Sequence, residues 1–275
     1  MKTRTFIAFL LSIWLITGCS QPAPTTQPSA STDVPVDNTD TPPDATEPEP
    51  TVPPEPTDTP DPLSAEGPID VTFQTADGVE LASTLYGPPD DLILVMVPQY
   101  PGEEAGWQTF AEAAATEGDR GLTFDLRGYG ASGGERSAEQ IPTDINAALS
   151  FVREQVGAQE IVLLGASQGA TGALSVAAND ANNILGLAIL SPPRSVDGLA
   201  VTDDELASIT LPSRWYAARN YLLHNLEEMH AAAGSDNKDL WIYEASSLRG
   251  TDLFDSIEGP DLTNRLLDFI AELDS

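Results

Sequence analysis

Cysteine, lysine and histidine are the residue types that this 275-residue chain has least of. Its single cysteine, Cys19, excludes an internal disulfide. With only two lysines, the chain has 12 basic residues against 43 acidic ones and a formal net charge of −31. This excess of negative charge argues against nucleic acid and anionic lipid surfaces as partners. The two histidines, His224 and His230, are the only imidazoles that the chain can offer as a general base.

The apolar run near the N-terminus, Phe6 to Ile16, is too short to span a bilayer comfortably. It follows two basic residues, as the hydrophobic part of a secretory signal peptide does. The Leu-Ile-Thr-Gly-Cys sequence that ends at Cys19 resembles a bacterial lipoprotein signal, in which the cysteine becomes the lipidated N-terminus. We therefore expect residues 1–18 to be removed and lipidated Cys19 to anchor an extracytoplasmic protein to the bacterial cell membrane. The alternative is an ordinary signal peptide with an incidental cysteine.

Residues 19–67 lack lysine and arginine and contain almost no large apolar side chain. A segment this rich in Pro, Thr, Asp and Glu cannot bury enough surface to offset the entropy of ordering it. It is predicted to be a disordered acidic tether, either a spacer away from the membrane or an unconstrained linker. Residues 68–275 remain as one folded domain, which is long enough to enclose a sizeable core.

The domain begins with two alternating segments around Ala76-Asp-Gly78, a pattern that predicts a β-hairpin. Strands and helices then alternate, which predicts a mostly parallel sheet with helices on both faces. Residues 194–209 are short and irregular, so we expect a minimal cap or none. The strands are predicted at 92–97, 121–125, 161–164, 184–190, 209–218 and 239–243, and the helices at 105–116, 142–156, 168–178, 219–233 and 262–273.

The sequence Gly165-Ala-Ser167-Gln-Gly169 lies between a buried strand and a helix of small residues. A serine at such a sharp turn is exposed to a substrate, and the flanking glycines let strand and helix approach closely. The first N–H groups of the helix point toward any oxyanion that forms there. This Gly-x-Ser-x-Gly arrangement resembles the nucleophile elbow of the α/β-hydrolase fold.

A second motif, Asp125-Leu-Arg-Gly-Tyr-Gly-Ala-Ser-Gly-Gly134, resembles the loop that follows the fourth strand in that family. It is a poor phosphate loop, because it lacks the terminal Lys-Ser/Thr of such motifs. The two motifs and the element order identify residues 69–275 as similar to α/β-hydrolases, in the branch of dienelactone hydrolases and serine aminopeptidase-like esterases.

The resemblance implies where an oxyanion hole would lie. One backbone donor would be Tyr100, in a loop where Pro98-Gln99 replaces the usual His-Gly of the family. The other would be the N–H of Gln168, directly after Ser167. A backbone donor survives changes of side chain, so we expect an oxyanion site here.

The catalytic triad that the resemblance implies is incomplete. The family's histidine follows the last core strand, where this chain has Arg249. An arginine stays protonated and cannot act as a general base. Asp197 is the candidate acid, at an alternative position that some relatives use. His224 is a candidate base in place of the missing histidine.

Three hypotheses follow. The first is a lipid-tethered α/β-hydrolase-fold protein with impaired or lost catalysis, which binds a small ligand or partner. In this case Arg249 would present a fixed positive charge beside Ser167 that suits an anion. The second is an active serine hydrolase for carboxylesters or short peptides, with Ser167 as nucleophile and His224 as base. The third is a structural envelope domain with an empty pocket. No metal or cofactor motif is found in the sequence, so we expect neither.

Overall fold

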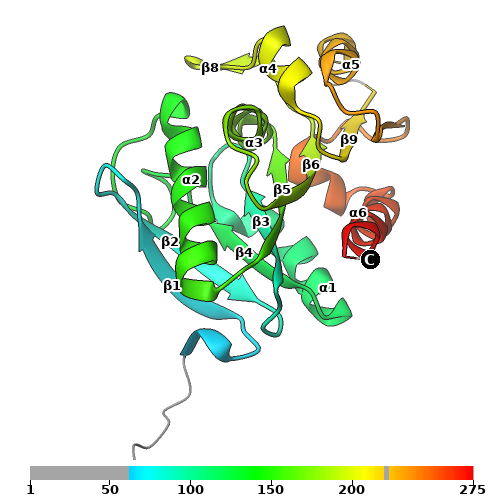
Figure 1. Ribbon diagram of the computed structural model, residues 1–275. Helices are drawn as coiled ribbons and strands as arrows, with labels where there is room; N and C mark the ends of the chain where they lie inside the picture. The colour runs from blue at the N-terminus through cyan, green and yellow to red at the C-terminus, as the bar shows by residue number, and fades with distance from the viewer. Residues whose placement is uncertain (1–61, 220–222, 275) are drawn as a thin grey trace, which may run out of the picture. The chain divides into compact units, whose positions relative to one another are not determined.

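The computed structural model describes residues 62–219 and 223–274 (Figure 1). Eight strands form one sheet in the order β1-β2-β4-β3-β5-β6-β9-β10. The first two pairings are antiparallel and the others are parallel. The strands are β1 (Ile69–Gln74), β2 (Glu80–Tyr86), β3 (Leu92–Val97), β4 (Arg120–Phe124), β5 (Glu160–Ala166), β6 (Ile184–Leu190), β9 (Ser213–Ala218) and β10 (Lys238–Tyr243).

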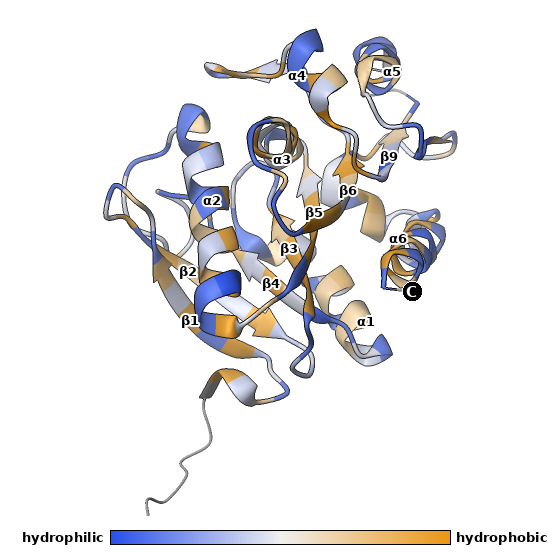
Figure 2. Cartoon of the chain, in the orientation of Figure 1, coloured by the Kyte–Doolittle hydropathy of each residue, from blue (hydrophilic) through white to orange (hydrophobic). Residues whose placement is uncertain are grey.

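Helices cover both faces of the sheet, as Figure 1 shows. One face packs against α2, α3, α4 and α5, and the other packs against α1 and α6. Figure 2 shows the apolar strands between these helix layers. The helices are α1 (Gln108–Glu117), α2 (Ile141–Phe151), α3 (Gln168–Asn179), α4 (Asp203–Ser208), α5 (Leu223–Ala232) and α6 (Gly259–Leu273).

The central strands are apolar without a break because both of their faces are buried. In β3, Val95 joins the core on the α2–α3 side, and its neighbour Leu94 joins the core on the α1–α6 side. β5 alternates in the same way. The expected α/β-hydrolase architecture, with a mostly parallel sheet, an N-terminal hairpin and helices on both faces, is confirmed.

The segment expected to be irregular has more structure than the sequence pattern predicts. It contains a small hairpin of β7 (Ser195–Val196) and β8 (Leu199–Ala200), followed by α4. Thr202 begins α4 with a reciprocal capping box, in which Glu205 N–H donates to Thr202 Oγ1 and Thr202 N–H donates to the Glu205 carboxylate. This cap motif explains how so short a helix forms.

The predictions for the signal peptide, Cys19 and most of the tether concern residues 1–61, which lie outside the described residues. Within 62–219 and 223–274, no helix combines the length and apolar character needed to cross a membrane. The described chain starts with a 3₁₀ turn, Pro62–Ser64, that packs close to β4, because buried Arg120 donates to the carbonyl oxygens of Leu63 and Ala65.

Candidate active site

Ser167 lies in a strained turn between β5 and α3. Its φ and ψ of 50° and −120° are unusual for a residue with a Cβ, and the residue is 9% exposed. Its N–H donates to Leu190 O of β6 at 2.8 Å, which fixes the turn to the neighbouring strand. A Cβ at Gly169 would lie 2.5 Å from Pro98 O, so only glycine allows α3 to approach the loop after β3 this closely. The local geometry is that of a nucleophile elbow.

The two predicted oxyanion donors lie at one cavity. Tyr100 follows β3, and Gln168 is the first residue of α3, so the Gln168 N–H has no partner within the helix. Both residues line a cavity of about 310 Å³ beside the elbow. The Tyr100 side chain is 59% exposed and meets the Tyr129 ring edge-on, with 6.3 Å between ring centroids.

The chain at Arg249 is held next to the elbow by its neighbour Gly250. A Cβ at Gly250 would lie 3.3 Å from the Cβ of Ala166, the residue before Ser167. The Gly250 N–H donates to Ser191 Oγ at 3.0 Å, after the end of β6. Gln99 joins this loop to the loop after β3, accepting from Thr251 N–H at 3.2 Å and donating to the carboxylate of Asp252 at 2.7 Å. The position after the last strand is thus near Ser167, and Arg249 there is exposed.

Neither histidine is bonded to Ser167 in the described part of the chain. The His224 side chain is 85% exposed, and its Nε2 lies 3.2 Å from Glu228 Oε1 in the next turn of α5. His230 packs edge-on against Trp215, with 5.8 Å between ring centroids. Burial, with a smaller contribution from Lys238, lowers the pKa of His230 below its ordinary value. His224 thus pairs with Glu228 in solvent, and the His230 ring is packed on Trp215 with its buried Nε2 unpartnered among the described residues.

Asp197, the candidate acid, lies at the tip of the β7–β8 hairpin with a φ of 41°. It is exposed and lines the cavity with Gln168, on the wall that the small cap contributes. The described histidines do not line this cavity. Asp197 is thus placed at the site, while an imidazole for it to orient is not.

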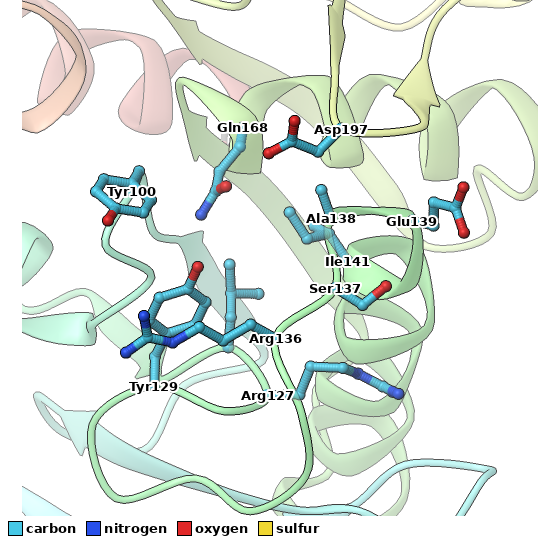
Figure 3. A pocket seen from close by; sticks show the side chains of 11 residues that line it. Tyr100, Arg127, Tyr129, Arg136, Ser137, Ala138, Glu139, Ile141, Gln168 and Asp197 are labelled. Atoms are coloured by element: carbon cyan, nitrogen blue, oxygen red, sulfur yellow. The ribbon is translucent and has the colours of Figure 1, made fainter. Parts of the chain in front are cut away.

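The cavity is lined by 11 residues, shown in Figure 3. The sequence predicted three of them, Tyr100, Gln168 and Asp197. The others come from the loop after β4 and from the start of α2, and the spacing of motifs did not reveal their part in the cavity. They are Leu126, Arg127, Tyr129, Arg136, Ser137, Ala138, Glu139 and Ile141.

The loop after β4 owes its rigidity to Asp125. Its buried carboxylate accepts from the N–H groups of Glu104 and Ala131, both at 2.8 Å. Arg127 pairs with Asp77 and with Asp144, both at 2.7 Å, and its guanidinium holds the pKa of Asp77 well below its usual range. The Asp125–Gly134 motif therefore builds one wall of the cavity.

Among the described residues, no group of three or more His, Cys, Asp and Glu side chains is arranged to hold a metal ion. The elbow and the cavity beside it present backbone donors, a serine hydroxyl, two tyrosines, one amide and charged side chains.

Comparisons with known proteins agree with this geometry. Residues 93–237 match the family model of the alpha/beta hydrolase fold, and the chain belongs to that family. Among solved structures, the Pyrococcus furiosus esterase Pf2001 is 18% identical with a TM-score of 0.66, over 74% of this chain and 90% of that one. The esterase EaEST from Exiguobacterium antarcticum is 18% identical with a TM-score of 0.60, over 75% and 100%.

An enol-lactonase from Burkholderia xenovorans LB400 is 13% identical with a TM-score of 0.61, over 73% of this chain and 100% of the lactonase. Identities this low show a shared fold. Among curated proteins no significant match was found.

Proposed function

We propose that this α/β-hydrolase-fold protein binds a small-molecule ligand beside Ser167 and has lost efficient serine–histidine hydrolysis. The observation that carries the proposal is that both imidazoles of the chain are committed away from Ser167. His224 pairs with Glu228 in solvent, and His230 packs on Trp215. A serine hydroxyl is a weak nucleophile at neutral pH without a base to accept its proton.

The size of the expected loss follows from known triads. Removing the histidine of a serine protease lowers kcat by about 10⁶-fold in subtilisin. Arg249 cannot replace that function, because a guanidinium keeps its protons. The chain keeps the elbow, the N–H of Gln168 at the start of α3, where it has no partner within the helix, and a cavity of about 310 Å³. This combination supports binding without efficient turnover.

Labelling with a fluorophosphonate probe tests the proposal, because such probes react with activated serines. We expect the wild-type protein and Ser167→Ala to be labelled to the same low level. Labelling that disappears in Ser167→Ala would contradict the proposal. Labelling that also disappears in His224→Ala would support the alternative, an esterase or peptidase with His224 as base.

We also propose that the domain is anchored to the bacterial cell membrane from outside the cytoplasm, through lipid on Cys19 and the acidic segment 19–67. The support is the signal-like sequence that ends at the single cysteine. In cell fractionation, the wild-type protein should remain with membranes, and Cys19→Ala should be released. Membrane retention of Cys19→Ala would contradict lipid anchoring.

A further inference from the structure

Gln168 brings an unsatisfied polar group into the cavity beside Ser167. The residue is 6% exposed, and its Nε2 is buried with no hydrogen-bond partner among the described residues. Figure 3 shows its side chain pointing into the cavity. A buried donor without a partner has lost its hydrogen bonds to water without a replacement, which is unfavourable. An acceptor atom of a ligand would remove this cost.

Arg136 supplies positive charge to the same cavity. Its guanidinium lies 4.5 Å from the centroid of the Tyr129 ring, and its Nε donates to Gly128 O at 3.1 Å. These two contacts hold the planar group in place. The other arginine of the lining, Arg127, is already committed to Asp77 and Asp144. Arg136 has no ion-pair partner within the described residues, so its charge is available to a ligand.

The Asp197 carboxylate stands across the cavity from Arg136, and Glu139 lines the same wall as Asp197. Asp197 comes from the tip of the β7–β8 hairpin, and Glu139 comes from the turn before α2. The two segments pack tightly, because a Cβ at Gly198 would collide with the side chain of Glu139. Figure 3 shows the Arg136 guanidinium and Tyr129 on one side and the Asp197 carboxylate on the other, while the Glu139 carboxylate points away from Gln168. Neither carboxylate has an ion-pair partner among the residues that the structure describes.

The cavity is thus bipolar. A simple anion would satisfy Arg136 and Gln168 but would face the Asp197 carboxylate. A simple cation would leave the Gln168 amide unpaired and face Arg136. A ligand with both charges, one at each end, meets every one of these groups with its complement. The volume of about 310 Å³ is at the small end of ligand pockets, which suits a molecule of the size of an amino acid or a dipeptide.

We propose that this cavity binds a small zwitterion, with its carboxylate at Gln168 and Arg136 and its ammonium group at Asp197. The inference rests on the proposed binding function and names its ligand class.

Isothermal titration calorimetry with a panel of zwitterions of increasing length tests it, using glycine, L-alanyl-L-alanine and 6-aminohexanoate. At least one member should bind, and its N-acetylated and C-amidated forms should each bind about tenfold more weakly or worse, as for a lost charge pair. Blocked forms that bind as tightly as the parent would overturn the proposal. So would the absence of binding by the whole panel at about 10 mM, well above the ~1 mM range of weak ligands.

Variants assign the two ends separately. Arg136→Gln should weaken the parent and the N-acetylated form but not the C-amidated one. Asp197→Asn should weaken the parent and the C-amidated form but not the N-acetylated one. Gln168→Met should behave like Arg136→Gln, since it removes the amide donor at nearly the same volume. Glu135→Gln is the matched control, an exposed charge next to Arg136 that does not line the cavity, and should change nothing.

Equal effects of Arg136→Gln and Asp197→Asn on all three ligand forms would overturn the assignment of ends. Fluorophosphonate labelling of the same preparations keeps the two proposals distinct. Failure of all zwitterions to bind, with Ser167 unlabelled, refutes only the ligand class. Labelling that depends on Ser167 refutes the proposed loss of hydrolysis.

Discussion

Arg120 ties the first described residues to the sheet, and this contact can be tested by removing either side of it. The residue is 0% exposed, and its guanidinium donates to Leu63 O at 2.7 Å, to Ala65 O at 2.8 Å and also to Gly87 O. Its Nε is buried with no partner among the described residues, and burial lowers its pKa. A chain that starts at Pro68 would leave this cation with one carbonyl in place of three.

The magnitude follows from the bonds lost. A hydrogen bond that involves a charged group contributes about 1.5–3 kcal/mol, and breaking a buried ionic contact costs about 3–5 kcal/mol. Two of the three bonds of Arg120 are lost when residues 62–67 are removed, and water that reaches the guanidinium offsets part of the loss. The free energy of unfolding should therefore fall by about 2–3 kcal/mol.

Urea unfolding of four proteins measures this coupling directly. Two of the chains start at Pro62 and two start at Pro68. Within each pair, one chain has Arg120 and the other carries Arg120→Met. In the protein with Arg120, removing residues 62–67 should lower the free energy of unfolding by about 2–3 kcal/mol. In the Arg120→Met background the same removal should lower it by under about 1 kcal/mol, because the guanidinium that these residues bond to is already absent. Equal losses of unfolding free energy in both backgrounds would show that the segment 62–67 does not stabilise the domain through Arg120.

Three further substitutions give separate tests. Burial, with Asp90, Asp274 and Glu117 nearby, raises the pKa of Asp119 to about 6, so the folded wild type loses stability as pH rises from about 4 to about 6. At pH 8 the free energy of unfolding of Asp119→Asn, measured in urea, should exceed that of the wild type by about 1 kcal/mol, after a discount for partial exposure. Below pH ~4 the two proteins should be equally stable. A gain of the same size at both pH values would contradict this. Gly169→Ala places a Cβ 2.5 Å from Pro98 O and should lower the free energy of unfolding by about 1–3 kcal/mol. Gly133→Ala is the control, because its Cβ would lie at an ordinary contact distance of 3.4 Å from Glu80 O. Similar losses of stability in both variants would be evidence against a tight elbow. His224→Ala should change the free energy of unfolding, measured in thermal melts, by less than about 0.5 kcal/mol and should leave zwitterion binding intact. A large change in stability or in binding would show that this imidazole does more than pair with Glu228.

The fold followed from the sequence because its signals are local. The unbroken apolar run of β3, the Asp-Gly turn of the hairpin and the Gly-x-Ser-x-Gly turn each determine a backbone conformation within a few residues. Element ends were less well predicted. β9 starts only at Ser213, after Pro212, rather than at Ile209. The β7–β8 hairpin and α4 were missed, because strands of two residues leave no periodic pattern.

The cavity was harder to predict for a physical reason. Tyr100 and Gln168 were found because each occupies a fixed place relative to a strand end. Arg136 and Glu139 reach the cavity through the path of a long loop, which depends on the buried carboxylate of Asp125 and on tertiary packing. The Asp125–Gly134 motif predicted that a loop follows β4. Its spacing does not indicate which of the residues after the motif line the cavity.

The hydrolysis of p-nitrophenyl acetate, compared between the wild-type protein and Ser167→Ala, tests the central claim most directly. Ser167 has its elbow and its neighbouring N–H groups, but no described imidazole is bonded to it. We expect the same slow background rate for both proteins under excess substrate, with no burst. Sustained turnover by the wild type that Ser167→Ala abolishes would contradict it.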